Sequence, residues 1–229
     1  RHGATSVNQY RELGYLPEAM NNFLALLGWS SPSGEEILSM GQMIREFSTD
    51  RLNSSPAVFD ETKLKWVNAC HLRAMDHKKL WSLIQPYLTG AGLDLPADVS
   101  WQDRSLQVFK TYMETLADAI ELYRPLANNA FKLAEEAQEV LQWPETRAVI
   151  AKWQDLLKNL PQDYLSEEEF NQLQNQVKEV CGVKGKHLFM PIRTAIIGKP
   201  HGAELKILVP LLTRQTLIER AQQVLQNCK

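Results

Sequence analysis

The sequence predicts an all-α protein of 229 residues. Apolar residues recur at the three- and four-residue spacing of helices along most of the chain. Three segments open with the capping-box pattern, which satisfies the unpaired amides of a first helical turn. Alternating strand patterns end within about four residues, so a sheet is not expected.

The predicted helices follow one another along the chain. Ser followed three residues later by Glu or Gln occurs at Ser6, Ser33 and Ser166, and each pattern predicts a helix that begins shortly after it. Residues 17–27 open with Pro, which is favoured at a first helical position, and stop at Gly28. Further helices are expected over residues 60–74, 77–88, 101–123, 129–142, 145–160, 166–180 and 213–226.

The composition is that of a globular chain. Hydrophobic residues make up 44% of it, and no apolar run is long enough to span a membrane or to form a signal peptide. Cys70, Cys181 and Cys228 are odd in number and far apart, which favours a reducing cytoplasm over a disulfide framework. The chain starts at Arg1 without an initiating Met, and we expect it to be a fragment.

Charge is distributed unevenly along the chain. Residues 1–100 carry a net charge of −2, residues 101–181 carry −6, and residues 182–229 carry +6, with 8 Lys and Arg against 2 Asp and Glu. An acidic middle followed by a basic end is expected of a chain that meets a polyanion with that end. Ordinary solvated surface charge is the alternative explanation.

Catalytic motifs are not found in the sequence. It contains no HExxH, GxGxxG, GxxxxGK[ST] or GxSxG pattern, so no metal site, phosphate-binding glycine loop or serine nucleophile is predicted. Cys181 and His187 have the chemistry of a nucleophile and its base, but a buried thiol beside a loop is the better interpretation. Binding is therefore expected rather than catalysis.

A family resemblance is carried by three stretches of the chain, RHGATSVNQYRELGYLPEAMNNFLALLGWS, SPAVFDETKLKWVNACHLR and GKHLFMPIRTAIIGKPHGAEL. They resemble the C-terminal half of bacterial glutamyl-tRNA synthetases, which are class I aminoacyl-tRNA synthetases, and the likeness runs through essentially the whole chain. The resemblance implies that Arg1 is the last residue of the KLSKR loop, whose lysines stabilise the transferring phosphate of ATP. It places the pocket for ATP, with Mg, and for glutamate upstream, so this piece alone is not expected to catalyse.

The same resemblance implies three helical parts. Residues 1–78 resemble the stem-contact domain that follows the catalytic domain and touches the inside corner of the tRNA. Residues 79–140 and 141–229 resemble two small helical anticodon-binding domains. The implied partner is tRNA(Glu), and a cytoplasmic monomer is expected. A helical protein-interaction module derived from such a domain is the alternative.

The resemblance assigns the anticodon contacts to the end of the chain. It directs Arg193 at the first anticodon base, and a guanidinium supplies both a flat face and a fork of donors. It directs Gly202, Ala203 and Leu205 at the middle base. Gly198 and Gly202 are expected to let a base approach the backbone, because neither carries a Cβ. Many relatives have Pro where this chain has Ala203.

Other residues near Arg193 have simpler interpretations. By itself, an arginine that follows a proline at a helix start is more often a surface ion-pair partner. Ile192 and Met190 are expected in the core. Diffuse contacts with the tRNA backbone are expected of Lys184, Lys186 and Lys199, because Lys acts as a point charge. Core packing is also expected of Trp66, Trp81, Trp101, Trp143 and Trp153.

The third anticodon base involves a departure from the family pattern. Synthetases that accept only the glutamate tRNA have an arginine shortly before a Thr-Leu pair. A second arginine, two helical turns earlier, supports the first. Matching that pair to residues 115–116 keeps Arg104 in the earlier place but puts Tyr112 at the discriminating one. Tyrosine presents no cationic fork. We therefore hypothesise a non-discriminating enzyme that also charges tRNA(Gln).

Overall fold

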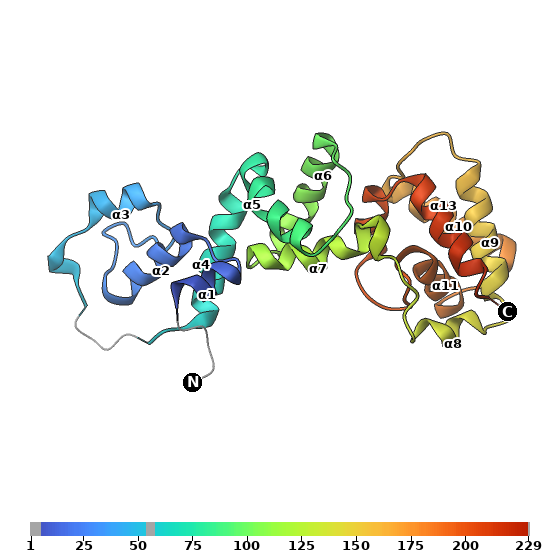
Figure 1. Ribbon diagram of the computed structural model, residues 1–229, viewed down its shortest axis with the longest axis horizontal. Helices are drawn as coiled ribbons and strands as arrows, with labels where there is room; N and C mark the ends of the chain where they lie inside the picture. Colours follow the sequence, from blue (N-terminus) through green and yellow to red (C-terminus); the bar gives the residue numbers. More distant parts are fainter. Residues whose placement is uncertain (1–5, 54–57, 229) are drawn as a thin grey trace. The chain divides into compact units, whose positions relative to one another are not determined.

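The computed structural model describes residues 6–53 and 58–228. Its regular elements are helices that follow one another along the chain (Figure 1). In these residues no β-strand occurs, and extended pairing is confined to the isolated bridges Trp29–Leu52 and Tyr164–Thr213. None of the helices in the same residues combines the length and the apolar character of a membrane span. The predicted all-α class is confirmed.

The described residues divide into two compact units. The first comprises residues 6–53, 58–92 and 98–122, and the second comprises residues 93–97 and 123–228. The chain therefore enters the second unit briefly, returns to the first, and then enters the second again. The division into three parts at residues 78 and 140 stays a prediction.

Short helices build the first unit. Helix α2 (Pro17–Gly28) packs against α4 (Glu61–Ala74), and Phe23 and Leu64 are fully buried there. The side chain of Asn68 ties two loops to α4, because its Oδ1 accepts from the Leu16 amide at 2.8 Å and its Nδ2 donates to the Glu114 carbonyl at 2.6 Å. The elements of this unit are α1 (Val7–Glu12), α2 (Pro17–Gly28), α3 (Met40–Glu46), η1 (Thr49–Arg51), α4 (Glu61–Ala74), α5 (His77–Gly90), α6 (Val99–Phe109), η2 (Lys110–Tyr112), η3 (Leu116–Asp118) and the start of α7 (Ala119–Tyr123).

One helix organises the second unit. Helix α9 (Thr146–Lys158) packs against α10 (Glu167–Cys181), α11 (Lys186–Ile197) and α13 (Arg214–Leu225). Its apolar face buries Val149, Ile150 and Trp153. The ring of Trp153 meets that of Phe170 edge to face, with 5.8 Å between the ring centroids. The elements are η4 (Arg124–Leu126), η5 (Asn128–Ala130), α8 (Ala137–Leu141), α9 (Thr146–Lys158), α10 (Glu167–Cys181), α11 (Lys186–Ile197), α12 (Leu205–Leu208), η6 (Val209–Leu211) and α13 (Arg214–Leu225).

A buried arginine on α13 joins three segments of the second unit. Nη1 of Arg220 donates to the carbonyls of Pro125 at 2.8 Å and Ile196 at 2.7 Å. Its Nη2 donates to the carbonyl of Ala127 at 3.2 Å, and the guanidinium lies 5.0 Å from the ring centroid of Phe131. Burial lowers the pKa of Arg220 to about 10, so the group remains charged at neutral pH. This network holds the C-terminal end of α11 in place.

Most of the predicted helices are confirmed. The capping boxes at Ser6 and Ser166 form and begin α1 and α10. The helices predicted from Pro17, at residues 60–74 and 77–88, and at residues 145–160 and 213–226 are observed as α2, α4, α5, α9 and α13. Their ends differ from the predicted ones by at most two residues.

The capping box predicted at Ser33 is wrong. Glu36, which would have completed it, instead pairs through its carboxylate with Nζ of Lys63 at 2.6 Å. The next helix is α3, where Ser39 and Gln42 form the reciprocal box. The helix therefore starts after a second serine, Ser39, and not after Ser33.

Two other helices are shorter than predicted. In residues 101–123 the helix is interrupted where the Asp118 carboxylate accepts from the amides of Glu114 at 2.9 Å and Thr115 at 2.8 Å, which starts a new turn. In residues 129–142 only α8 and the short η5 are helical. The backbone between them packs instead against the start of the loop that follows α11.

Candidate nucleic-acid interface

Helix α11 carries Arg193 on the flank of its buried face. Ile192 and Ala195 are fully buried, whereas Arg193 is half-buried and Met190 is partly buried. The core position expected for Ile192 is therefore confirmed. Pro191 lies inside the helix, and Arg193 is its eighth residue, so the expected position at a helix start is wrong.

The guanidinium of Arg193 is anchored to the loop that follows its own helix. Nη1 donates to the carbonyl of Gly202 at 3.2 Å and to the carbonyl of Ala203. Burial lowers the pKa of Arg193, and the nearby Glu204 carboxylate acts in the opposite direction. Among the described residues, no hydrogen bond uses Nε or Nη2 of this side chain. The arrangement fixes the guanidinium and leaves two of its donor nitrogens for a ligand.

Gly198 has a different role from the one expected of it. It ends α11 at a φ of 77°, and a Cβ built on it would lie 2.1 Å from the carbonyl oxygen of Lys132. The amide of Ala134 also donates to the Gly198 carbonyl at 2.9 Å. The space beside Gly198 is therefore filled by the protein's own backbone, and the expectation that a base approaches there is wrong.

The remaining loop residues differ in their accessibility. Gly202 and Ala203 are exposed, and a Cβ on Gly202 would meet only side-chain atoms of Ile197 and Lys199, at 3.4 Å. Leu205, the first residue of α12, is 5% exposed. A base at this loop therefore has access to Gly202 and Ala203, and a contact at Leu205 would use its backbone.

The three lysines expected to meet the tRNA backbone lie at both ends of α11. Lys184 lines a pocket between α10 and α11. Nζ of Lys186 lies 5.5 Å from the ring centroid of Trp143, in cation–π geometry. Lys199 is exposed directly after Gly198. All three belong to the same unit as Arg193.

The Cys181 and His187 side chains engage different partners. The Cys181 thiol donates to the Ala148 carbonyl at 3.7 Å, and burial raises its pKa. Nδ1 of His187 pairs with the Glu145 carboxylate. A raised thiol pKa disfavours the nucleophilic thiolate, in keeping with the interpretation of Cys181 as a buried thiol, although the residue is only partly buried.

Arg104 and Tyr112 belong to the first unit, whereas Arg193 and its loop belong to the second. Nη1 of Arg104 donates to the hydroxyl of Ser100 at 3.1 Å, one helical turn earlier on α6. Tyr112 ends η2 and is 57% exposed. Its exposed ring is available for stacking, and Arg104 is held along its own helix.

The surface around Tyr112 was not predicted from the sequence. Trp66 is 42% exposed, so the core position predicted for it is wrong, although Trp101 and Trp153 are fully buried as predicted. Trp66 and Tyr112 line a pocket of about 600 Å³ together with Thr62, Lys65, Ala69, Arg73, Thr111, Glu114 and Asp118. The spacing of Lys65, Trp66, Ala69 and Arg73 on one face of α4 was the available signal.

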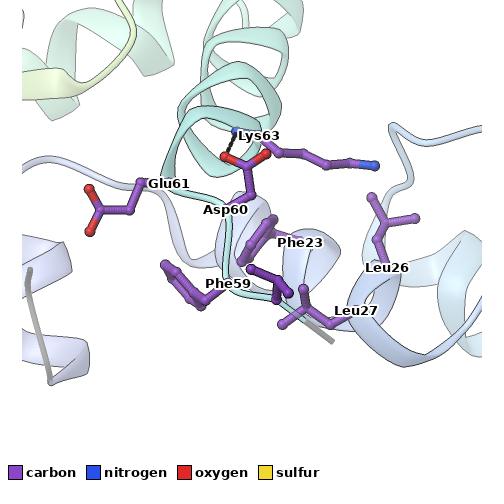
Figure 2. Close-up of a pocket in the computed structure, with 8 residues that line it drawn as sticks. Phe23, Leu26, Leu27, Phe59, Asp60, Glu61 and Lys63 are labelled. Atoms are coloured by element: carbon purple, nitrogen blue, oxygen red, sulfur yellow. Dashed lines mark hydrogen bonds between the residues drawn. The ribbon is translucent and has the colours of Figure 1, made fainter. Parts of the chain in front are cut away.

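Another pocket of the first unit has a different character. Figure 2 shows Phe23, Leu26, Leu27 and Phe59 around it, with Asp60 and Glu61 at the start of α4. The Asp60 carboxylate accepts from the backbone amide of Lys63 at 3.2 Å. Lys63 also lines the pocket, but its Nζ pairs with the Glu36 carboxylate, so an apolar hollow beside two further carboxylates does not suit a polyanion.

Arg1, expected at the end of the ATP loop, lies outside the described residues. Within residues 6–53 and 58–228, no three His, Cys, Asp or Glu side chains are grouped so as to hold a metal ion. The candidate interface therefore consists of Arg193 with residues 198–205, the lysines beside them, and the separate surface at Tyr112.

Comparison with known proteins identifies what kind of chain this is. Residues 79–225 match the family model of an anticodon binding domain, and residues 1–66 match that of the catalytic domain of class I tRNA synthetases (E and Q). A glutamate–tRNA ligase of Bdellovibrio bacteriovorus is 53% identical over 98% of this chain and 46% of its own length. One of Geobacillus stearothermophilus is 40% identical over 96% of this chain and 46% of its own length.

A solved structure shares the fold of this chain. A crystal structure of a glutamate tRNA ligase from Elizabethkingia meningosepticum matches 96% of this chain and 43% of that chain, with a TM-score of 0.81 at 24% identity. The chain spans about half the length of the curated relatives it matches. These findings confirm the resemblance to the synthetases. The chain belongs to the anticodon-binding domain family, and its curated relatives are glutamate–tRNA ligases.

Proposed function

We propose that this chain is the tRNA-binding part of a glutamate–tRNA ligase, which attaches glutamate to tRNA(Glu) with ATP. The observation that carries the proposal is the guanidinium of Arg193, half-buried and anchored through Nη1 to the loop carbonyls of Gly202 and Ala203. It lies inside the segment that matches an anticodon-binding domain. In this proposal ATP, Mg²⁺ and glutamate bind in the catalytic domain, and no chemical step is assigned to the described residues.

The proposed recognition uses single-stranded RNA chemistry. Bases splayed from an anticodon loop are read by stacking and by hydrogen bonds to their edges. The first anticodon base lies against Arg193, whose Nε and Nη2 donate to its edge. The middle base lies at Gly202 and Ala203, where the exposed backbone offers polar groups. The charge of +6 over residues 182–229 attracts the phosphates.

Arg193→Ala tests the proposal directly. We expect it to weaken binding of a labelled tRNA(Glu) anticodon stem-loop by about 1–3 kcal/mol, because a donor fork to one base is lost. Fluorescence anisotropy across a salt series measures the affinity, and circular dichroism checks the helical signal. Arg147→Ala is the matched control, since Arg147 also donates to backbone carbonyls of the second unit. Equal losses in both variants, or an unfolded Arg193→Ala, would return Arg193 to a structural role.

Tyr112 supports a finer proposal, that the parent enzyme also charges tRNA(Gln). The exposed ring at this position can stack on the third anticodon base but presents no cation. In the full-length enzyme, Tyr112→Arg should reduce charging of tRNA(Gln) while charging of tRNA(Glu) continues. Aminoacylation of both purified tRNAs measures this, with Tyr112→Phe as the control. A wild-type enzyme that leaves tRNA(Gln) uncharged contradicts the proposal.

The salt series also separates this function from a protein-interaction module. RNA binding through phosphates weakens steeply as salt rises, whereas a module would show no binding or no salt dependence. We further propose a monomer working in the cytoplasm, where the free thiols Cys70, Cys181 and Cys228 would stay reduced. Sedimentation of the purified chain, with and without the stem-loop, measures the oligomeric state.

A further inference from the structure

A polar groove lies in the second unit between α10 and α11. This α10–α11 groove is a pocket of about 350 Å³. Two ammonium groups, three side-chain amides and one aromatic ring surround it, and none of its lining residues carries a carboxylate. The lining residues are Asn171, Gln174, Asn175, Lys178, Lys184, Gly185, Leu188 and Phe189.

The charge of the groove sets it apart from the other pockets described. The pocket at Phe59 is lined by Asp60 and Glu61 beside Lys63, and the pocket at Tyr112 is lined by Glu114 and Asp118 beside Lys65 and Arg73. Cations without carboxylates favour an anionic ligand. The amides add donors and acceptors of the kind that bind the edge of a base.

The sequence of α10 builds one wall of the groove. Asn171, Gln174, Asn175 and Lys178 recur at three- and four-residue spacing, so they share one face of the helix. Apolar residues on another face, among them Val177, are buried in the core. The turn after α10 then brings Lys184 to the same pocket.

Phe189 on α11 forms the apolar part of the groove. It is 49% exposed, although the neighbouring Leu188 is buried. Phe189 precedes Arg193 by four residues, so the two lie on the same face of α11, about 6 Å apart along the axis. Exposed aromatic rings beside cations are typical of surfaces on which successive bases of a single strand stack.

We propose that the α10–α11 groove binds the nucleotide immediately 5′ of the anticodon. Its base stacks on Phe189, and Lys178 and Lys184 contact its phosphates. The direction follows from the order along α11, because the middle base is proposed at the loop after this helix and the first base at Arg193. The next place toward the N-terminal end of α11 is therefore Phe189. This inference rests on the proposed function and extends its binding site by one nucleotide.

The stacking step is tested by a cycle between protein and RNA. Phe189→Leu should weaken binding of the intact tRNA(Glu) anticodon stem-loop by about 5- to 100-fold. On a stem-loop whose nucleotide 5′ of the anticodon lacks its base, the same variant should bind within about twofold of the wild-type chain, because there is no ring to stack. Phe189→Trp should retain binding, and Val180→Ala, which trims an apolar side chain 66% exposed on α10, is the control.

The phosphate contacts are tested by salt dependence. Replacing both Lys178 and Lys184 by Gln should reduce the slope of log K against log salt by about 1.4, the value for two contacts on a single strand. Lys158→Gln removes the charge of an exposed lysine at the end of α9, outside the groove, and should leave the slope of log K against log salt unchanged. Circular dichroism verifies that each variant retains its helices.

The outcomes distinguish this inference from the function on which it rests. A wild-type chain that fails to bind the stem-loop overturns both. Wild-type binding that is weakened by Arg193→Ala but unchanged by Phe189→Leu overturns the groove alone. The groove is also overturned if Phe189→Leu loses the same affinity for the intact and for the abasic stem-loop. An unchanged slope of log K against log salt in the Lys178 and Lys184 double variant has the same consequence.

Discussion

Two arginines of the second unit show how burial decides the role of a residue. Arg220 is almost fully buried, and its two terminal nitrogens donate to three backbone carbonyls. Arg193 is half-buried and uses only Nη1 in the hydrogen bonds of the described residues. The first arginine is therefore structural, and the second retains donors for a ligand.

Replacing Arg220 tests this structural role. Arg220→Met should lower the free energy of unfolding of the second unit by about 3 kcal/mol or more, because buried carbonyls lose their donors. Arg220→Lys retains the charge but lacks the planar fork, and we expect an intermediate loss. Urea denaturation followed by circular dichroism measures both. An unchanged free energy of unfolding in the Met variant would show that the Arg220 hydrogen bonds do not stabilise the second unit.

At the scale of elements, the loop between α11 and α12 depends on one backbone position. Gly198 is left-handed at a φ of 77° and lies against Lys132, while Gly34 has a φ of 76° with no heavy atom near its Cβ position. The two glycines therefore have similar backbone conformations, but only at Gly198 would an added Cβ collide with neighbouring backbone atoms.

Gly198→Ala should disrupt the loop that holds Arg193. The left-handed backbone alone costs about 1–2 kcal/mol, and the new Cβ must also displace the backbone of Lys132. Hydrogen exchange should show lost protection in residues 198–205, and affinity for the anticodon stem-loop should fall with it. Gly34→Ala carries the same backbone cost without the clash, so its local loss should be smaller. Similar losses of hydrogen-exchange protection around residues 34 and 198 would show that the predicted clash with Lys132 has no effect.

Elements governed by local chemistry were predictable from the sequence. The capping boxes at Ser6 and Ser166 need only neighbours within one turn, and both form. The box at Ser33 does not form, and Glu36 pairs instead with Lys63, far along the chain. At the candidate site, the motif drew attention to Arg193, but the exposure of Phe189 and Trp66 depends on tertiary packing, which helical periodicity does not report.

At the scale of the whole molecule, each unit has its own core. Trp101 is fully buried in the first unit and Trp153 in the second. Cooperative units of this kind open separately when their cores are independent. A cavity in one core is therefore expected to destabilise that unit selectively.

A pair of matched variants tests this independence. Trp153→Ala should cost about 3–5 kcal/mol and reduce hydrogen-exchange protection in residues 123–228 while residues 6–53 keep theirs. Trp101→Ala should produce the opposite pattern. Peptide-resolved mass spectrometry measures both. Loss of protection in both units from either variant would mean that the two cores unfold together.

The path of the chain through the two units has a consequence during synthesis. Residues 93–97 belong to the second unit but leave the ribosome before residues 98–122, which complete the first. Within the second unit, the amide of Asp94 donates to Oδ1 of Asn129, and its carbonyl accepts from the amide of Asn128. At typical translation rates these partners emerge roughly 2–7 s after Asp94. In the nascent chain, residues 93–97 are therefore synthesised before their hydrogen-bond partners in the second unit, during the time in which the last residues of the first unit are added.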